Sequence, residues 1–493
     1  MAKIKIDLAE RHDVSPYLYM QFMEPLGVCD SSVDAAWDFT EQDWYPDVIS
    51  KTKELAPRMI RWGGCFASYY HWREAIGPFS QRVPMVNYCW NGIYNNQVGT
   101  HEFLDFCRRV GADPMLVVNM ESDGRMKWAH PKNGTDRFGT AEEAAEWVDY
   151  CNNPNNAERI KNGAEAPFGV KYWQIGNETS YDTSGYGAEK TAEVTMRFAD
   201  KMKSVDGSIK LLGWGDYDHK KADMSWCRRM SEIDGVDIIA FHHHFPPESP
   251  DAPFKAVDYR RNYALAWEHM QRARLSLEAH LDEMRADCGG KKLAMTEGHF
   301  VFPGRNRNEV LSSWGAGAAY ARNLNVIMRN SDILEVATMA DFCGNVWQVN
   351  ALMIPTPMRP GKTYLQPVGE VMRLYGTHVG KKYLDTTYSG EVDATATKTA
   401  NTVYLHITNT SMTSAQRVEI DLGAVNPPKT AKMHLISADP ETEITPDNVD
   451  VFQPVTATVD VDNIVLPAAA VAVLELEIMQ VRPAAAQSLR TRL

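Results

Sequence analysis

Eight short apolar runs alternate with longer segments of helical period between residue 17 and about residue 375. Runs that are apolar at every position are typical of strands covered by helices on both faces, as in a parallel sheet. The pattern predicts an α/β fold, a (β/α)8 TIM barrel. The runs are YLYMQF (17–22), RMIRW (58–62), PMLVVNM (114–120), VKYWQIGN (170–177), IKLLGWG (209–215), VDIIAFHHH (236–244), KLAMTEG (292–298) and LEVATMADF (334–342).

An open, doubly wound sheet would show the same alternation of strands and helices. Such sheets often bind dinucleotides through a GxGxxG turn after the first strand. None of the expected first turns carries this motif. The closed barrel is therefore the favoured interpretation.

The pattern changes to strict alternation after about residue 380. TVYLHIT places Val403, Leu405 and Ile407 on one face, and RVEIDLG and VAVLELEI alternate in the same way. Short alternating strands between turn-rich stretches predict an antiparallel β-sandwich. The opening KIKIDL also alternates. We expect three parts: a barrel over 17–378, a sandwich built from 1–16 and 379–481, and a tail at 482–493.

The charge of the chain bears on its partners, and its cysteine content bears on its cellular compartment. The chain has 64 acidic and 51 basic residues, a net charge of −13 that disfavours nucleic acid and anionic membranes as partners. It lacks both a signal-like opening and an apolar window of about 18 residues. The eight cysteines are scattered without a CxxC pair, which indicates reduced thiols. We expect a cytoplasmic protein without nucleic-acid or membrane partners.

Two glutamates follow expected strands at the ends where barrel enzymes carry their catalytic groups. Glu178 ends the fourth strand and Glu297 ends the seventh. Two carboxyl groups facing one cleft can act as proton donor and nucleophile in the cleavage of a glycosidic bond. Each could instead be a solvated residue at a strand end, but their joint placement favours a catalytic pair.

Polar neighbours of these glutamates add candidates for substrate binding. Asn177 could donate to the sugar hydroxyl next to the anomeric carbon, or cap the following helix. In FHHHF, His242 and His244 share one strand face and His243 takes the other. This pair with a carboxylate could hold zinc, but the first strand offers no HxH motif. We expect hydrogen-bonding roles and no metal.

Five segments, in chain order, resemble glycoside hydrolase family 51, the retaining α-L-arabinofuranosidases. They are VSPYLYMQFMEPLG, RWGGCFASYYHWREAIGP, GTHEFLDFCRRVGADPMLVVNM, TAEEAAEWVDYCNNP and VKYWQIGNETS. The resemblance covers residues from about 4 to 380 and extends to the sandwich. It implies that Glu178 is the acid/base, Glu297 the nucleophile and Glu24 a ligand for furanose hydroxyls. Asn177 and His242 also match family positions, and the resemblance implies a homo-oligomer.

The sequence departs from the family pattern around the sugar. Cys65 places a thiol where a sugar-binding amide is usual, His244 replaces a tyrosine, and Asp341 stands near the position of a binding glutamine. All three remain candidates for substrate binding. Because a site built around hydroxyls rejects mismatched analogues strongly, we expect poorer hydrolysis of 4-nitrophenyl α-L-arabinofuranoside than by ordinary family members. We also expect a preference for a glycone with different hydroxyl positions or an extra exocyclic group near Cys65. The alternative is an unchanged pocket with variation outside it.

The sequence thus predicts a retaining exo-glycosidase that removes terminal α-L-arabinofuranosyl residues from a neutral oligosaccharide or glycoside without a cofactor. The same chemistry on a galactofuranoside or a xyloside is the nearest alternative. Two alternatives belong to other classes: a metal-dependent barrel hydrolase that uses His242 and His244, and a sugar-binding protein without catalysis.

Overall fold

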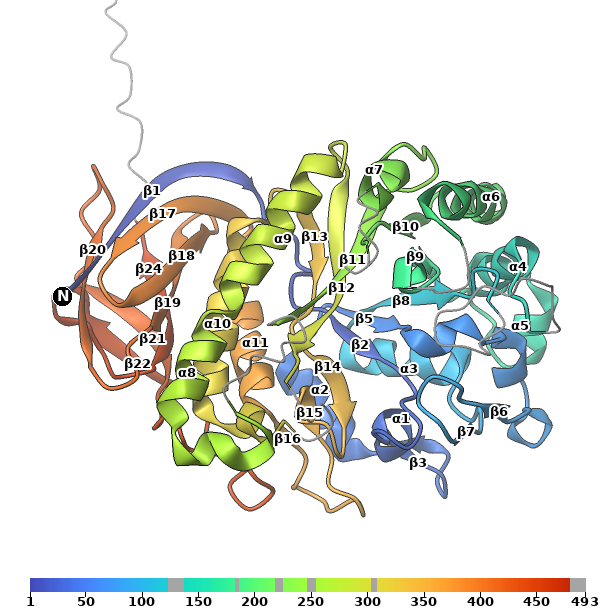
Figure 1. Ribbon diagram of the computed structural model, residues 1–493, viewed down its shortest axis with the longest axis horizontal. Helices are drawn as coiled ribbons and strands as arrows, with labels where there is room; N and C mark the ends of the chain where they lie inside the picture. The colour runs from blue at the N-terminus through green and yellow to red at the C-terminus, as the bar shows by residue number, and fades with distance from the viewer. Residues whose placement is uncertain (123–136, 182–185, 218–224, 246–253, 303–307, 479–493) are drawn as a thin grey trace, which may run out of the picture.

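The computed structural model describes residues 1–122, 137–181, 186–217, 225–245, 254–302 and 308–478. An eight-stranded sheet lies at its centre, in the order β13-β12-β11-β10-β9-β8-β5-β2 (Figure 1). Every strand pair in it is parallel. The strands are β2 (Gln21–Met23), β5 (Met59–Trp62), β8 (Asp113–Val118), β9 (Tyr172–Ile175), β10 (Lys210–Trp214), β11 (Ile238–Phe245), β12 (Lys292–Phe300) and β13 (Leu334–Ala337).

Backbone hydrogen bonds join the last strand of this sheet to the segment that leads into the first. Met20 N donates to Ala337 O at 2.9 Å, and Ala337 N donates to Tyr17 O at 3.1 Å. The sheet therefore closes into a barrel, and the predicted (β/α)8 fold is confirmed. Each of the eight apolar runs overlaps one barrel strand.

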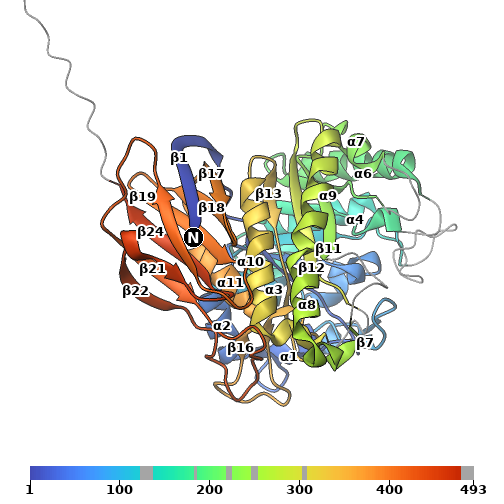
Figure 2. The same ribbon diagram turned by 60° about the vertical axis from the view of Figure 1, so that its left-hand side comes forward.

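Helices follow the strands and surround the barrel (Figures 1 and 2). Arg272 separates two of these helices, 263–271 and 273–287, and its backbone N–H donates to His269 O in a tight turn. Among the described residues, no helix is both long and apolar enough to cross a membrane. The helices are α1 (Ser32–Ala36), α2 (Pro46–Leu55), α3 (Thr100–Val110), α4 (Ala141–Asn152), α5 (Ala157–Lys161), α6 (Ala188–Val205), α7 (Trp226–Ser231), α8 (Tyr263–Gln271), α9 (Ala273–Asp287), α10 (Trp314–Arg329) and α11 (Pro367–Thr377).

A nine-stranded, mostly antiparallel sheet follows the barrel in the order β22-β21-β24-β19-β18-β17-β1-β20-β23. The pair β1–β20 is parallel. Residues of β20 and β21, near opposite ends of this order, belong to one apolar core, so the sheet curls over itself. The strands are β1 (Ala2–Asp13), β17 (Lys382–Ser389), β18 (Val392–Lys398), β19 (Thr402–Asn409), β20 (Gln416–Asp421), β21 (Thr430–Ile436), β22 (Val455–Asp460), β23 (Val465–Leu466) and β24 (Val471–Glu477).

The predicted fold class of a barrel with an antiparallel C-terminal β-domain is confirmed, while the domain boundaries stay predictions. The predicted tail at 482–493 lies outside the described residues. One predicted strand, 334–342, is two separate elements, because β13 ends at Ala337 and β14 begins at Asp341 in another sheet. The small sheets comprise β14 (Asp341–Gly344) with β15 (Asn350–Met353) and β16 (Tyr364–Leu365), β3 (Trp37–Asp38) with β4 (Asp43–Trp44), and β6 (Met85–Val86) with β7 (Ile93–Tyr94).

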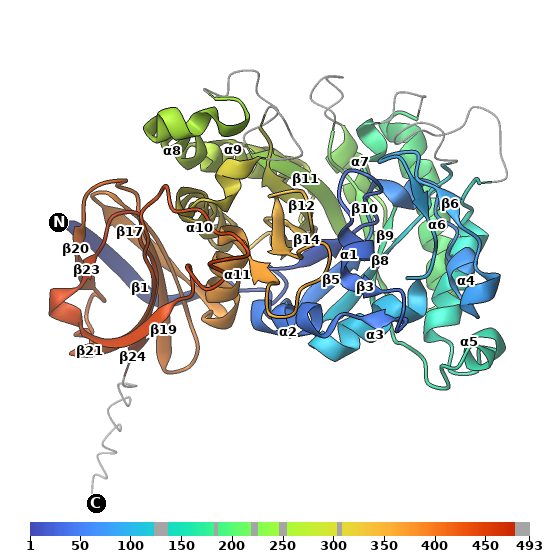
Figure 3. The same ribbon diagram turned by 90° about the horizontal axis from the view of Figure 1, so that it is seen from below.

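Helices α10 and α11 lie between the barrel strands and the nine-stranded sheet (Figures 1 and 3). Asp393 of β18, with a side chain only 1% exposed, crosses this joint. Its carboxylate accepts hydrogen bonds from Arg329 Nη1 at 2.9 Å, Arg322 Nε at 3.3 Å and Asn325 Nδ2 at 3.0 Å. A buried carboxylate thus holds two arginines of α10 against the sheet.

We expect Asp393→Ala to lower the free energy of unfolding by about 3–5 kcal/mol, because it leaves two largely buried guanidinium groups without their partner. Asp385→Ala is the matched control. Asp385 pairs with Arg11 at 2.7 Å, but its side chain is 53% exposed. An exposed pair contributes about 1 kcal/mol or less. Urea unfolding measures the free energy of unfolding of both variants. Equally small losses of this free energy in the two would contradict the assigned role of Asp393.

Candidate active site

The turn after β9 directs Glu178 into the barrel mouth. Gly176 has φ 71° and Glu178 has φ 51°, both in the left-handed region. A Cβ on Gly176 would lie 2.9 Å from Thr179 Cγ2, so the turn requires glycine. Left-handed backbone at a non-glycine residue costs about 1 kcal/mol or more and is common at functional sites. The Gly-Asn-Glu sequence therefore forms a strained turn, and its Glu178 is only 3% exposed.

His242 of β11 lies between the two predicted catalytic carboxylates. Its Nδ1 is 2.9 Å from Glu178 Oε1 and 3.6 Å from Glu297 Oε2. One carboxylate oxygen of each glutamate and one ring nitrogen of His242 all lie within 4.8 Å of one another. The fourth and seventh barrel strands therefore bring Glu178 and Glu297 together, with the sixth strand supplying the histidine.

Arg61, in the middle of β5, organises the floor of the site. Its side chain is fully buried and donates to Glu297 Oε1 at 2.9 Å, Asn177 Oδ1 at 2.6 Å and Gln174 Oε1 at 2.9 Å. A buried guanidinium opposite a carboxylate favours the ionised carboxylate. We did not predict Arg61 or Gln174 as functional residues, although a polar residue inside an apolar run was visible in each strand.

Burial lowers the pKa of His242 to about 4, and it outweighs the opposite effect of the Glu297 carboxylate. The imidazole is therefore neutral near pH 7. Its Nδ1 faces Glu178, and its Nε2 lies 3.0 Å from Thr296 Oγ1. A neutral ring with two such partners holds its orientation without adding charge.

A buried ion pair supports β11 behind His242 and was also missed by the sequence analysis. Asp216 Oδ1 lies 3.2 Å from His280 Nε2, and Asp216 Oδ2 accepts from the backbone N–H of His242. Burial raises the pKa of Asp216, but the His280 pair and backbone hydrogen bonds lower it overall. The pKa of His280 is raised by Asp216 despite burial. This pair fixes the strand that carries His242.

Glu24 lies just beyond β2 and faces the same centre. Its Oε1 accepts from Phe66 N at 3.1 Å and from Trp90 Nε1 at 2.9 Å. A Cβ on Gly64 would lie 2.1 Å from Glu24 Oε2, so glycine is required beneath this carboxyl group. Burial, and then the nearby Glu297, raise the pKa of Glu24 well above its ordinary value.

Cys65 and Asn177 both contact the catalytic centre. Cys65 Sγ lies 3.8 Å from Glu178 Oε2, and burial raises the pKa of the thiol well above its usual value. Asn177 Nδ2 is buried and has no hydrogen-bond partner among the described residues. A buried donor without a partner is available to a substrate oxygen. Two aromatic residues also lie at this site: Trp90 donates to Glu24, and Trp214 packs edge-on against His242 at 4.5 Å.

His244 and Asp341 lie in a second group nearer the ends of the strands. In the pairing of β11 with β12, His242 lies opposite Glu297 and His244 lies opposite His299. The rings of His244 and His299 are 4.6 Å apart, and His299 Nε2 is 3.7 Å from Asp341 Oδ1. This group therefore continues the active-site face one step toward the carboxyl ends of the strands.

His243 points to the other face of β11. Its Nε2 lies 3.0 Å from Ser276 Oγ of α9. The predicted division of the three histidines between the two strand faces is confirmed. The metal alternative needed His242 and His244 as ligands, whereas both nitrogens of His242 already face protein groups, namely Glu178 and Thr296.

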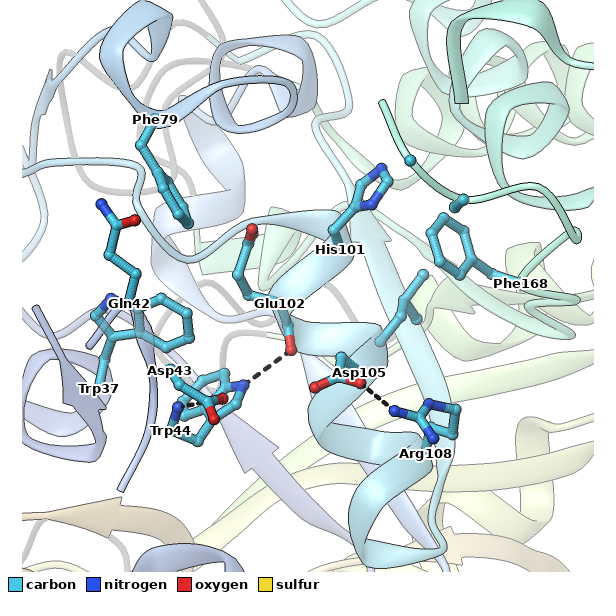
Figure 4. A pocket seen from close by; sticks show the side chains of 13 residues that line it. Trp37, Gln42, Asp43, Trp44, Phe79, His101, Glu102, Asp105, Arg108 and Phe168 are labelled. Atoms are coloured by element: carbon cyan, nitrogen blue, oxygen red, sulfur yellow. Dashed lines mark hydrogen bonds and ion pairs between the residues drawn. The ribbon is translucent and has the colours of Figure 1, made fainter. Parts of the chain in front are cut away.

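A cavity of about 450 Å³ lies away from these carboxylates, beside α3 and the β3–β4 hairpin (Figure 4). Charged residues on its wall are paired, as Glu102 is with Arg82 and Asp105 with Arg108. A hollow of about 10 Å³, lined in part by Asn177, lies beside the turn that carries Glu178. The convergence of buried ionisable groups, rather than cavity size, favours this cluster as the candidate active site.

Comparisons with known proteins match most of the chain to one class of enzyme. The family model described as alpha-L-arabinofuranosidase 1 domain matches residues 51–262, and the alpha-L-arabinofuranosidase C-terminal domain matches residues 303–469. An intracellular exo-alpha-L-arabinofuranosidase of Bacteroides ovatus is 26% identical over 456 residues, covering 82% of this chain and 81% of the relative.

Solved structures show the same fold over nearly the whole chain. An arabinose complex of the Thermotoga maritima alpha-L-arabinofuranosidase has a TM-score of 0.78 at 23% identity, covering 97% of this chain and 100% of the other. The GH51 arabinofuranosidase of Xanthomonas axonopodis pv. citri has a TM-score of 0.78 at 22% identity, covering 97% and 99%. Two domain models of one enzyme class match in order along the chain, and the chain belongs to the α-L-arabinofuranosidases of glycoside hydrolase family 51.

Proposed function

We propose that this enzyme removes terminal α-L-arabinofuranosyl residues from oligosaccharides with retention of configuration, using Glu178 and Glu297. The observation that carries the proposal is the approach of their oxygens to within 4.8 Å. Retaining glycosidases hold their two carboxyl groups about 5–5.5 Å apart, whereas inverting enzymes need about 6.5–9.5 Å to admit a water molecule between base and sugar. The short separation favours direct attack by a carboxylate.

Glu297 is the proposed nucleophile because the buried guanidinium of Arg61 stabilises its negative charge. Glu178 is the proposed acid/base, in contact with the neutral His242 and the thiol of Cys65. In the first step, a Glu297 oxygen bonds to the anomeric carbon while the glycosidic bond breaks. The proton of Glu178 passes to the departing oxygen, which leaves as an alcohol.

In the second step, the Glu178 carboxylate takes a proton from water as the water oxygen attacks the anomeric carbon. The bond to Glu297 breaks and restores its carboxylate, and two inversions give net retention. A neutral His242 suits both steps, because it can donate to ionised Glu178 and accept from the protonated form. The Thr296 hydroxyl can accept from His242 Nε2 or donate to it, because a hydroxyl does both, so it can match either tautomer of the ring.

Five further residues are proposed to bind the sugar. Asn177 Nδ2 would donate to the hydroxyl next to the anomeric carbon, and Glu24 would bind further furanose hydroxyls. Cys65, beside Glu178, would contact the same ring. His244 and Asp341 lie one step further along the active-site face and would meet groups at the edge of the bound glycone.

The comparisons do not favour galactofuranose or xylose as the glycone. We also propose an intracellular location, because the Bacteroides ovatus relative carries that description. The homo-oligomer stays a prediction.

Rates on 4-nitrophenyl α-L-arabinofuranoside and on the matching galactofuranoside and xyloside test the glycone. We expect the arabinofuranoside to give the highest kcat/KM of the three, in place of the poor hydrolysis predicted from Cys65, His244 and Asp341, because a relative that matches 82% of this chain is named an exo-alpha-L-arabinofuranosidase. With methanol as acceptor, proton NMR should show methyl α-L-arabinofuranoside, the retained product. The β-anomer would disprove the mechanism, and a preference for another glycone would disprove the substrate. Activity that survives a chelator excludes the metal-dependent alternative.

A further inference from the structure

A second group of side chains of the types that ligate metals lies at the joint between the barrel and the nine-stranded sheet. It consists of His378, just after α11, His434 of β21 and Glu475 of β24. Glu475 Oε1 lies 3.0 Å from His378 Nδ1 and 2.9 Å from His434 Nε2. Two imidazoles from different parts of the fold are therefore directed at one carboxylate oxygen.

The strand register explains this convergence. In the pairing of β21 with β24, Lys432 lies opposite Glu475 and His434 lies opposite Val473. All four side chains share one face, since alternate residues of a strand point the same way. Val473 belongs to the core that continues into the barrel, so this face is turned toward α11. Figures 1 and 3 show α11 beside the sheet.

The neighbours of the three side chains orient them further. His434 Nδ1 lies 2.9 Å from Thr456 Oγ1, which fixes the ring with Nε2 toward Glu475. Lys432 Nζ lies 4.0 Å from the other carboxylate oxygen, Oε2, and leaves Oε1 to the histidines. Hydrogen bonds to the second nitrogen of a histidine are the usual support of a metal ligand.

We propose that His378, His434 and Glu475 bind a Zn²⁺ ion that ties α11 of the barrel to the sheet. Imidazole nitrogens and a carboxylate oxygen are ordinary zinc ligands, at about 2.0–2.2 Å from the ion. A tetrahedral ion then needs its ligand atoms about 3.3 Å apart. Here His434 Nε2 lies 2.9 Å and His378 Nδ1 lies 3.0 Å from Glu475 Oε1. One ligand atom from each of the three residues lies within 4.8 Å of the other two.

Access and room for the ion come from the partial exposure of two ligands. The side chain of His378 is 23% exposed and that of Glu475 is 20% exposed, so water can complete the coordination. The rings of His378 and His434 are stacked at 3.7 Å, and a small outward rotation of His378 opens the angle between them. The alternative is a triad of hydrogen bonds in which Glu475 accepts from both rings.

The zinc content of the protein distinguishes the proposed zinc site from the hydrogen-bonded triad. Protein stripped with a chelator is incubated with excess Zn²⁺, desalted and measured by mass spectrometry of the metal. We expect the wild type to retain one zinc per chain more than His378→Gln or Glu475→Gln. The matched control is His71→Gln, because His71 and Glu143 form a pair of similar exposure, 18% and 20%, at 2.7 Å. This control should retain the wild-type zinc content.

Stability and spectroscopy give independent readouts. Zn²⁺ should raise the thermal midpoint of the wild type and of His71→Gln by a few degrees, because a ligand that binds the native state stabilises it. It should not raise that of His378→Gln. Co²⁺ in place of zinc should give visible absorption bands that are absent from His378→Gln and Glu475→Gln. Equal zinc contents in all variants, with equal responses to zinc, would overturn the proposal in favour of the hydrogen-bonded triad.

The test is separate from that of the catalytic mechanism. The other such group among the described residues consists of Glu178, His242 and Glu297. Any zinc bound there would be equally present in every variant above. Arabinofuranoside hydrolysis by His378→Gln should stay within about twofold of the wild type under conditions where both are folded. Loss of the zinc difference and loss of activity are therefore distinguishable outcomes.

Discussion

Replacement of Glu297 by alanine should abolish turnover of every glycoside, whatever its leaving group, with a loss in kcat on the order of 10⁵-fold or more. Neither nearby carboxyl group can take its place, since Glu178 is held by His242 as the proposed acid/base, and Glu24 is held by Phe66 and Trp90. The variant also leaves Arg61 buried without its partner, which costs about 3–5 kcal/mol of stability. Folding must therefore be checked by circular dichroism alongside the kinetics.

Glu297→Gln preserves the shape of the side chain and should be equally inactive. Glu121→Ala is the matched control, because Glu121 follows barrel strand β8, is buried, has φ 55° and pairs with Arg197 and Tyr186. It should retain most of the activity. Azide added to Glu297→Ala should give a β-arabinofuranosyl azide, the inverted product. A retained product from this variant would reverse the two assignments.

Replacement of Glu178 by alanine should separate substrates by their leaving groups. Loss of general acid catalysis costs about 10²–10⁴-fold when the departing oxygen needs a proton. Arabino-oligosaccharides should lose that amount in kcat/KM, whereas a dinitrophenyl arabinofuranoside should form the glycosyl-enzyme at nearly the normal rate. The second step also lacks its base, so the intermediate should accumulate and give a burst of released phenol.

Azide should rescue this second step and give the α-azide, because the anion attacks without a base. Rates of the first turnover, measured by stopped flow for leaving groups of increasing basicity, provide the test. The wild type should respond weakly to leaving-group basicity and Glu178→Ala steeply. An equal loss on all leaving groups would show that Glu178 acts on binding or structure rather than as the acid.

The barrel was predictable because its strands are buried on both faces and so read as apolar runs. The end of the eighth strand was not predictable in the same way. Met339 and Ala340 lie in the turn between β13 and β14, yet both are fully buried. An apolar turn contains no Gly, Pro or polar residue that would mark the end of a strand. The predicted strand therefore extends across the turn. Asp341 was therefore placed on a barrel strand, although it begins a different sheet.

The candidate site was predictable only in part for a related reason. Glu178 follows β9 and Glu297 was expected to end its strand, and position near a strand end alone suggests chemistry. In the structure β12 continues beyond Glu297 to Phe300. Arg61 within β5 and Asp216 just after β10 are equally buried and equally polar, but in sequence each has the same appearance as a residue of a structural ion pair. Their roles depend on which strands are neighbours in the closed barrel. That information comes from the register of the sheet, as with His242 opposite Glu297.

The position of β1 has a consequence for how the chain is made. This first strand lies between β17 and β20, so residues 2–13 have no sheet to join until residues 382–421 have been synthesised. Domains generally fold as they leave the ribosome, from the N-terminus onward. Here the N-terminal segment must wait, unpaired, through the synthesis of the whole barrel. A barrel expressed alone would carry an orphan strand with an exposed edge, which favours aggregation.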